Sequence, residues 1–315
     1  MPFGTLRYDR PELVTTDTVY DVASITKSIP TACLALKLIE EGKLSLDEKV
    51  IDHVPELQND YRQDILIRHL LTYTVVFDFP EGLSSIAKAR PESVLPEMFK
   101  APLMAPPGKR YYYTNPPAIL LGLVMERLEK QTLEEQAQRV FKPLGMSRST
   151  YHVPESEMSQ VAPSEVGDRG ELQGRVQDET AWALGREGRL GGHAGLFSCA
   201  GDLLTFAQML LAKGTYEGHR YFRPQTVRLM HTNQLPYLKE SASLGWEIAS
   251  AKVMGSKVGP AAFGKTGFAG CNIVIDPEKM AALVILSNRT YPHRQTTRDD
   301  INAVRRAVAD VVFGD

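Results

Sequence analysis

The apolar residues of this 315-residue chain change their spacing near residue 240. Before that point they recur every three or four positions, which is typical of amphipathic helices. After it they alternate or form short apolar runs bounded by turn residues, which is typical of strands. Strands that follow one another through tight turns pair as antiparallel neighbours. The chain is therefore expected to place a mainly helical region beside an antiparallel sheet.

This pattern also places the expected elements. The expected helices cover residues 24–41, 67–72, 117–130, 202–213 and 298–313. The expected strands cover residues 244–249, 262–266, 272–275 and 281–287, and a turn at 276–279 joins the last two as a hairpin. Pro30 should remove one backbone hydrogen bond from the first helix and bend it. Residues 145–200 are rich in Gly, Ser, Glu and Arg and are predicted to form long loops.

The final helix has one apolar face, formed by Ile301, Val304, Val308, Val311 and Val312. An amphipathic helix stabilises a fold by burying such a face. The expected fold class is therefore α+β, with this helix packed on the sheet.

Composition excludes several classes of protein. A net charge of −2 gives no reason to expect a nucleic acid or an anionic membrane as partner. No apolar run reaches the length of about 20 residues that a membrane helix needs. The N-terminus shows no charged segment followed by an apolar stretch, so no signal peptide is visible. The chain as given is expected in the cytoplasm, although a truncated start could hide an export signal.

The cysteines do not suggest a disulfide framework. Cys33, Cys199 and Cys271 are odd in number and lie among apolar or small neighbours, so buried free thiols are expected. No Cys-x-x-Cys or His-x-x-x-His pattern is present to bind zinc. We therefore expect neither a metal nor another cofactor.

The first candidate catalytic motif is Ser24-Ile25-Thr26-Lys27. A serine hydroxyl is a weak nucleophile until a base takes its proton. Residues three apart meet on one face of a helix, so Lys27 can accept that proton if burial keeps it partly neutral. The alternative is that Ser24 only caps a helix, and the same spacing occurs by chance at Ser85 and Lys88.

The second motif is Tyr113-Thr114-Asn115, directly before the helix expected at 117–130. Tyr113 would act as a phenol with a lowered pKa that passes a proton to the leaving group. The amide of Asn115 would then hold a carbonyl of the substrate. The alternative is that Asn115 is a helix N-cap and Tyr113 a packed aromatic residue, and both uses of Asn115 are compatible.

The third motif, Lys265-Thr266-Gly267, ends an expected strand. Gly267 would let a substrate backbone approach closely. Lys265 would hold Tyr113 deprotonated, and Thr266 would bind a substrate carboxylate. The alternative is an ordinary lysine on an edge strand.

Ser-x-x-Lys and Lys-Thr-Gly occur together in penicillin-recognising enzymes. With Tyr-x-Asn between them, this chain resembles the serine β-lactamase and penicillin-binding-protein superfamily. The branch it resembles holds class C β-lactamases, D-alanyl-D-alanine peptidases and β-lactamase-like carboxylesterases. The similarity covers about residues 17–312 and includes the segments 20–27, 41–44, 68–72, 143–146 and 194–198.

The resemblance implies both a fold and a mechanism. The fold would be an antiparallel sheet flanked by helices, formed by residues 1–23 and 240–315, with a mainly helical domain at 24–239. Ser24 would form an acyl-enzyme, with Lys27 and Tyr113 as the acid-base pair and Lys265 and Asn115 completing the polar network. The backbone N–H groups of Ser24 and Phe268 would form the oxyanion hole.

The chain departs from the family pattern in four places. Pro116 directly after Asn115 is expected to restrict Asn115 to extended backbone geometry. Only 23 residues precede Ser24, so the usual N-terminal strands are apparently missing. The sheet edge left open would invite a second copy of the chain to pair there. Residues 73–76 read Tyr-Thr-Val-Val in place of His-Thr-Ser-Gly, and Phe268 is bulky where β-lactamases carry a small residue.

We therefore expect a serine hydrolase acting on small esters or D-amino-acid peptides, with weak or no β-lactamase activity. The expected substrate contacts are Asn115, Thr266, Gly267 and Phe268. Two alternatives are a β-lactamase proper and a non-catalytic penicillin-binding-like protein. His193 suggests a catalytic triad, but one histidine without known geometry carries little weight.

Overall fold

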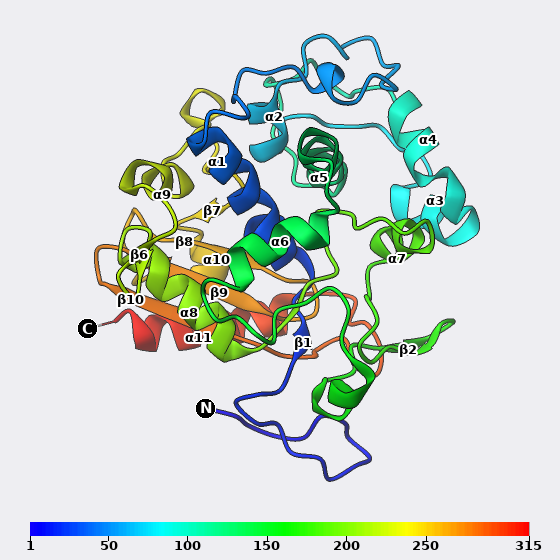
Figure 1. The fold of residues 1–315 in the computed structure, drawn as a ribbon. Helices are drawn as coiled ribbons and strands as arrows, with labels where there is room; N and C mark the ends of the chain where they lie inside the picture. Colours follow the sequence, from blue (N-terminus) through cyan, green and yellow to red (C-terminus); the bar gives the residue numbers. More distant parts are fainter. Residues whose placement is uncertain (315) are drawn as a thin grey trace.

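The C-terminal strands build the main sheet. In the computed structural model, which describes residues 1–314, these strands are antiparallel and lie in the order β10-β9-β8-β7 (Figure 1). They are β7 (Glu247–Ile248), β8 (Phe263–Thr266), β9 (Asn272–Asp276) and β10 (Ala281–Ile285). The predicted antiparallel sheet and the hairpin at 276–279 are confirmed, although β7 is shorter than the expected strand at 244–249.

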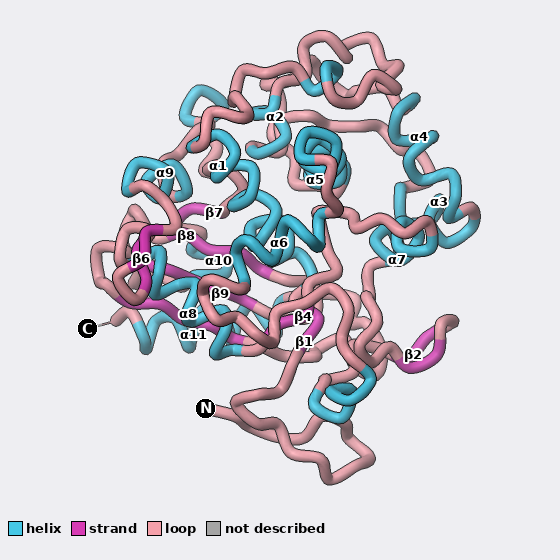
Figure 2. Tube along the Cα trace, in the orientation of Figure 1, coloured by secondary structure: helices cyan, strands magenta, loops and turns pink. Residues whose placement is uncertain are grey.

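Helices and long loops make up most of the chain before β7, and two more helices follow it (Figure 2). The α-helices are α1 (Cys33–Glu40), α2 (Ile67–Leu71), α3 (Leu83–Ala89), α4 (Val94–Lys100), α5 (Pro116–Glu129), α6 (Leu133–Phe141), α7 (Glu179–Arg186), α8 (Ala200–Leu211), α9 (Pro224–Met230), α10 (Ala251–Met254) and α11 (Asp299–Val312). Short 3₁₀ or π segments are η1 (Ala23–Lys27), η2 (Ser28–Ala32), η3 (Val50–Asp52), η4 (Pro91–Ser93), η5 (Glu155–Gln160) and η6 (Pro236–Leu238). Two-residue strands pair as β1 (Tyr20–Asp21) with β4 (Phe197–Ser198), β2 (Val166–Gly167) with β3 (Gly170–Glu171), and β5 (Thr215–Tyr216) with β6 (His219–Arg220).

Helices cover both faces of the main sheet. Every residue of β9 is buried, and successive side chains of a strand point to opposite faces. Ile273 and Ile275 enter the large core, which also contains Phe206 of α8. Val274 enters a separate cluster with Ala309 of α11. The sheet is thus the middle layer between α8 and α11.

Helix length does not separate the predicted helices from the missed ones. α2, α5, α8 and α11 lie within two residues of their expected bounds. α3, α4, α6, α7, α9 and α10 were not predicted, although α6 has an amphipathic pattern and a capping box formed by Thr132 and Glu135. The prediction of loops throughout 145–200 is wrong at α7, where the Asp178 carboxylate accepts the Ala181 N–H and caps the helix.

The helix predicted at 24–41 is interrupted. Ile29 has φ −119° and ψ 111°, which lie outside the helical region, so η1, η2 and α1 follow one another instead of forming one helix. The residue before a proline is disfavoured in helical geometry, which accounts for the break before Pro30. The break separates the short turn that carries Ser24 and Lys27 from the longer helix α1.

The apolar face predicted for α11 is not the face that packs on the sheet. Val304, Val308, Val311 and Val312 are exposed, with Val311 at 78%. The buried face instead carries Arg305, whose guanidinium donates to the carbonyls of Gly267 and Cys271 at 2.9 and 2.7 Å. These carbonyls, at the end of β8 and the start of β9, also accept the backbone N–H groups of Gly270 and Gly267, so Arg305 supplies a second hydrogen bond to each. These bonds turn the polar face of the helix towards the sheet.

β10 is one edge of the main sheet, and its five residues are half-buried. An open edge is thus present among the described residues, while pairing of a second copy there stays a prediction. The domain boundaries at residues 24 and 240 also stay a prediction. The three cysteines are free and buried, as expected. No helix in the described part of the chain is long and apolar enough to cross a membrane.

Replacing Arg305 with methionine should destabilise the fold by about 1–3 kcal/mol, because two buried carbonyls would each lose a hydrogen bond from a charged donor while keeping one backbone donor. Arg306 is the matched control, since its guanidinium makes one long contact of 3.2 Å to the Lys252 carbonyl at the surface. Arg306→Met should cost less than about 1 kcal/mol. Urea unfolding of both variants gives the comparison, and equal losses would contradict the role assigned to Arg305.

Candidate active site

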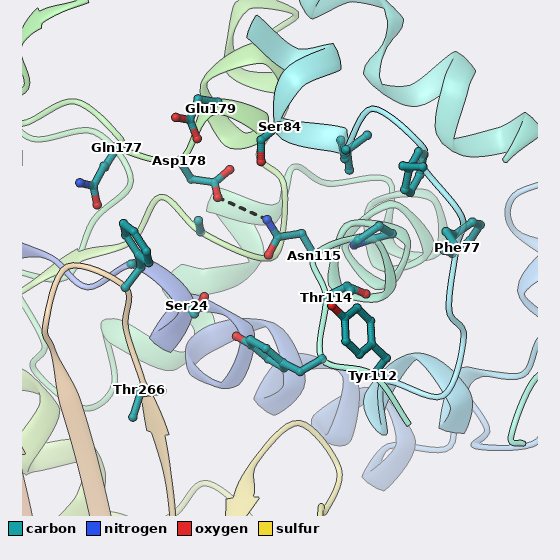
Figure 3. A pocket seen from close by; sticks show the side chains of 18 of the residues that line it. Ser24, Phe77, Ser84, Tyr112, Thr114, Asn115, Gln177, Asp178, Glu179 and Thr266 are labelled. Carbon is teal, nitrogen blue, oxygen red and sulfur yellow. Dashed lines mark hydrogen bonds between the residues drawn. The ribbon is translucent and has the colours of Figure 1, made fainter. Parts of the chain in front are cut away.

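The three motifs meet at one cavity of about 660 Å³. Ser24, Tyr113, Asn115, Thr266 and Phe268 all line it. They come from η1, from the loop before α5 and from the end of β8, so the cavity lies where the helical region meets the sheet. Figure 3 shows Ser24, Asn115 and Thr266 around the same open space.

Local backbone contacts present Ser24 to this cavity. Ala23 has a left-handed φ of +48°, which costs a non-glycine residue about 1 kcal/mol. The Asp21 carboxylate accepts the Ala23 N–H at 2.8 Å, and the Thr26 hydroxyl donates to the Ala23 carbonyl at 2.6 Å. Ser24 is half-buried while the other residues of η1 are buried, so this turn exposes the serine side.

Lys27 contacts the serine without a carboxylate partner of its own. Its Nζ lies 2.9 Å from Ser24 Oγ and 2.9 Å from the His193 carbonyl oxygen, and the side chain is 1% exposed. Burial lowers the pKa of Lys27, and the positive charge of Lys265 lowers it further. A neutral fraction of Lys27 can therefore accept the proton of Ser24.

Lys265 is equally buried but has the opposite electrostatic environment. Its Nζ donates to Glu247 Oε1 at 2.7 Å, from the neighbouring strand β7. Burial opposes the charge of Lys265, but the Glu247 carboxylate outweighs burial and raises the pKa of Lys265. Lys265 is therefore a permanent cation, which sequence reasoning could not distinguish from Lys27.

Tyr113 lies between the two lysines. Lys265 Nζ lies 3.9 Å from the centroid of its ring and Lys27 Nζ lies 5.3 Å away. Burial favours the neutral phenol, yet the charges of Lys265 and Lys27 outweigh it and lower the pKa of Tyr113. The ring of Tyr73 packs edge-on against it at 5.0 Å between centroids. Tyr73, which stands where the family usually has histidine, thus packs against the ring of Tyr113.

Asn115 occupies the N-cap position of α5, but its side chain caps nothing there. Its φ of −79° and ψ of −41° are helical, so the extended geometry predicted for the residue before Pro116 is wrong. Its Nδ2 instead lies 3.3 Å from Asp178 Oδ2, as the dashed line in Figure 3 shows. The capping alternative for this side chain is therefore wrong. The Asp178 carboxylate, at the N-cap of α7, thus orients the side-chain amide of Asn115 at the cavity.

Gly267 allows close packing of the backbone, in addition to the approach of a substrate backbone that the sequence predicts. A Cβ built at this position would overlap the carbonyl oxygen of Val22, two residues before the nucleophile. Glycine therefore lets the end of β8 lie directly against the segment that carries Ser24. Arg305 donates to the Gly267 carbonyl from behind, which fixes this strand end.

Sequence reasoning missed Asp178. Its Oδ1 accepts from the Ala181 N–H and lies 2.9 Å from His193 Nε2, and its side chain is 26% exposed at the cavity wall. Burial opposes its charge, but His193 outweighs burial and holds the pKa of Asp178 well below its usual range. His193 itself is fully buried and reaches Lys27 only through its backbone carbonyl. The sequence signal was an Asp before an apolar helical run, which indicates a cap and not a site.

The second Ser-x-x-Lys copy forms no such arrangement. Ser85 and Lys88 lie on α3, and Lys88 Nζ pairs with Glu179 at 3.1 Å instead of contacting Ser85. Among residues 1–314, no three His, Cys, Asp or Glu side chains gather as a metal site would require.

The profile of the Beta-lactamase family matches residues 3–307. The chain belongs to this family. It is 28% identical over 324 residues to a "Putative D-alanyl-D-alanine carboxypeptidase" of Escherichia coli (strain K12), covering 92% of this chain and 73% of that protein. A Salmonella agona (strain SL483) protein of the same description is 27% identical over 333 residues, covering 95% and 75%.

Solved structures share the fold. EstCE1, "a hydrolase with promiscuous acyltransferase activity", superposes with a TM-score of 0.76 at 19% identity, covering 99% of this chain and 89% of that one. The octameric penicillin-binding protein homologue from Pyrococcus abyssi gives a TM-score of 0.74 at 22% identity, covering 99% and 70%. The predicted β-lactamase/transpeptidase-like α+β fold is confirmed. The family consists of serine hydrolases.

The buried amine of Lys27 leads to a prediction about stability. Because folding lowers the pKa of Lys27, its charged form destabilises the native state at neutral pH, and this penalty disappears as the pH rises towards the ordinary value of 10.5. Relative to wild type, Lys27→Met should therefore be more favoured at neutral pH than near pH 10.5. Urea unfolding across this range measures the difference. A difference that does not change with pH would contradict the lowered pKa.

Proposed function

We propose that the protein is a serine hydrolase that forms an acyl-enzyme on Ser24 and acts on small esters or D-amino-acid peptides. One observation carries the proposal: Lys27 Nζ lies 2.9 Å from Ser24 Oγ in a buried setting that favours the neutral amine. A nucleophile within hydrogen-bond distance of an adapted base is the arrangement that acyl transfer requires.

In the proposed acylation step, Ser24 Oγ attacks the substrate carbonyl and its proton passes to neutral Lys27. The oxyanion forms at the predicted hole, made by the backbone N–H groups of Ser24 and Phe268. Tyr113 delivers a proton to the leaving group and recovers one from Lys27, while Lys265 stabilises the phenolate between transfers. Water then attacks the acyl-enzyme with the same groups acting in reverse.

The leaving-group side of the cavity favours a carboxylate. Arg298 lines the cavity with its guanidinium 5.1 Å from the centroid of the Phe268 ring, and it forms no ion pair within residues 1–314. Thr266 lines the same cavity. An unpaired guanidinium and a hydroxyl in one cavity suit a C-terminal carboxylate. This supports a D-alanyl-D-alanine carboxypeptidase-like activity, in line with the name carried by the Escherichia coli relative.

The opposite rim is apolar and supports an esterase activity on acyl groups of moderate size. The cavity residues that form it are Phe77, Phe79, Leu83, Met104 and Tyr112. Met104 and Tyr112 are about half exposed, at 50% and 54%, so an apolar acyl chain could cover them.

β-Lactam hydrolysis should be weak or absent, because Phe268 narrows the space beside the end of β8. The non-catalytic alternative is disfavoured, because a scaffold without activity has no need for two buried lysines in different charge states. Burying an amine without a carboxylate partner costs stability, and such a cost is typical of functional sites.

Ser24→Ala should abolish hydrolysis of a short aryl ester, lowering kcat by about 1,000-fold or more while the fold is retained. Ser85→Ala is the matched control, since it removes the serine of the other Ser-x-x-Lys copy at an exposed position on α3. It should leave turnover unchanged. Ester hydrolysis rates together with intact-mass detection of an acyl adduct provide the measurement. Normal turnover by Ser24→Ala would overturn the proposal.

Glu247→Gln should make activity more sensitive to alkaline pH. Lys265 faces Glu247, Tyr113 and Tyr73, with Lys27 nearby, and Glu247 is the carboxylate that raises its pKa. Without that charge, Lys265 loses its proton at lower pH, so the alkaline limb of kcat/KM moves to lower pH. At alkaline pH we expect kcat/KM to fall about 10-fold or more relative to wild type.

A pH series of kcat/KM for wild type, Glu247→Gln and Glu247→Asp measures this effect. The aspartate variant keeps the charge and should keep the wild-type limb. A uniform loss of activity at every pH in Glu247→Gln would instead indicate a purely structural role.

A further inference from the structure

We propose that the wall formed by Asp178 and Asn115 binds the ammonium group of the acyl part of the substrate, so that preferred substrates carry a free amino group. This inference rests on the proposed function, because the acyl group would be the one transferred to Ser24. It names the substrate class within the small esters and peptides considered above.

The contact with Asp178 fixes which end of the Asn115 side-chain amide faces the cavity. Its Nδ2 lies 3.3 Å from Asp178 Oδ2. An ionised carboxylate can only accept hydrogen bonds, so the NH₂ end of the amide must face it. The carbonyl oxygen of Asn115 then remains on the side of the cavity that holds Ser24, as Figure 3 shows. Asn115 therefore offers the substrate an acceptor, beside the second N–H that its NH₂ group keeps after donating to Asp178.

Asp178 adds a second acceptor beside it. Oδ1 is occupied by the Ala181 N–H and His193 Nε2, both at 2.9 Å, so the carboxylate is held in place. Oδ2 has only the long contact of 3.3 Å to Asn115 among the described residues. With 26% of the side chain exposed at the cavity wall, Oδ2 can accept a further hydrogen bond from a bound molecule.

The carboxylates at this wall differ in how far they are already paired, and the His193 partner of Asp178 contacts only Oδ1. Glu179 is already paired with Arg294 at 2.7 Å and with Lys88 at 3.1 Å. The charge of Lys265 is balanced by Glu247 at 2.7 Å. Asp178 is thus the carboxylate at this wall that combines solvent access with an unfilled acceptor site, and an ion entering a partly buried site needs such a partner.

An ammonium fits two convergent acceptors because it carries three donors and a positive charge. An N-acylated amine has no positive charge and only one N–H, so it would interact more weakly with the oxygens of Asn115 and Asp178. The wall therefore distinguishes free amino-acyl substrates from N-acylated ones. For the same reason, penicillins that carry an acylamido side chain in place of a free amine should be poor substrates.

Three matched methyl esters test the inference: D-alanine methyl ester, N-acetyl-D-alanine methyl ester and methyl D-lactate. They share the leaving group and differ in having an ammonium, an acylated amine or a hydroxyl at one position. We expect wild type to hydrolyse the free-amine ester with kcat/KM about 10-fold or more above the other two at neutral pH. Methanol release provides the rate for all three.

Two variants locate the effect. Asp178→Asn keeps a helix-capping side chain but removes the charge, and it should reduce the preference for the free-amine ester to about 2-fold or less. Asp168→Asn is the matched control, because Asp168 is exposed in the turn between β2 and β3 and does not line this cavity. It should keep the wild-type preference.

Each outcome decides something. The inference is overturned if wild type hydrolyses the N-acetyl ester as fast as the free-amine ester or faster. It is also overturned if the preference for the free-amine ester survives unchanged in Asp178→Asn. If N-acetyl-D-alanine methyl ester and methyl D-lactate are hydrolysed through Ser24 with no preference for the amine, the inference fails and the proposed function stands. If no ester is hydrolysed through Ser24, both fail.

Discussion

The difference in charge between two buried lysines is the constraint on which this site depends. Lys265 has Glu247 at 2.7 Å, whereas Lys27 has a hydroxyl and a backbone carbonyl at 2.9 Å. A desolvated amine keeps its proton only if an anion replaces the lost water. One carboxylate on β7 therefore separates a permanent cation from a candidate base, and Tyr113 between them has its pKa lowered by both.

The fold holds these groups together by packing backbone against backbone. Gly267 lets the end of β8 lie on the Val22 carbonyl, just before Ser24. Arg305 of α11 supports that strand end from the opposite face of the sheet. The nucleophile is thus positioned by elements from both ends of the chain, so loss of α11 packing should disturb the site as well as the sheet.

The helical region contributes the polarity of the cavity. The segment around Asp178 is attached to the nucleophile segment, because the Asp21 carboxylate accepts both the Ala23 and the Gln177 N–H at 2.8 Å. Burial raises the pKa of Asp21 to about 6, so these two donors hold a carboxylate that is costly to ionise. Asp178, Asn115 and Ser24 consequently occupy related positions, so the proposed ammonium site and the proposed nucleophile lie on one cavity.

The sequence alone determined the family, the four main strands and the residues Ser24, Lys27, Tyr113 and Lys265, because short motifs and regular spacing are local properties of the chain. It could not determine which face of α11 packs, since the valine stripe is local whereas the Gly267 and Cys271 carbonyls that bind Arg305 come from a distant part of the chain. Nor could it assign charge states to Lys27 and Lys265, or find Asp178, because a pKa and a cavity wall depend on which distant side chains lie nearby. Only the tertiary structure brings Glu247, Asp178 and His193 to those positions and so decides the chemistry that each motif residue can perform.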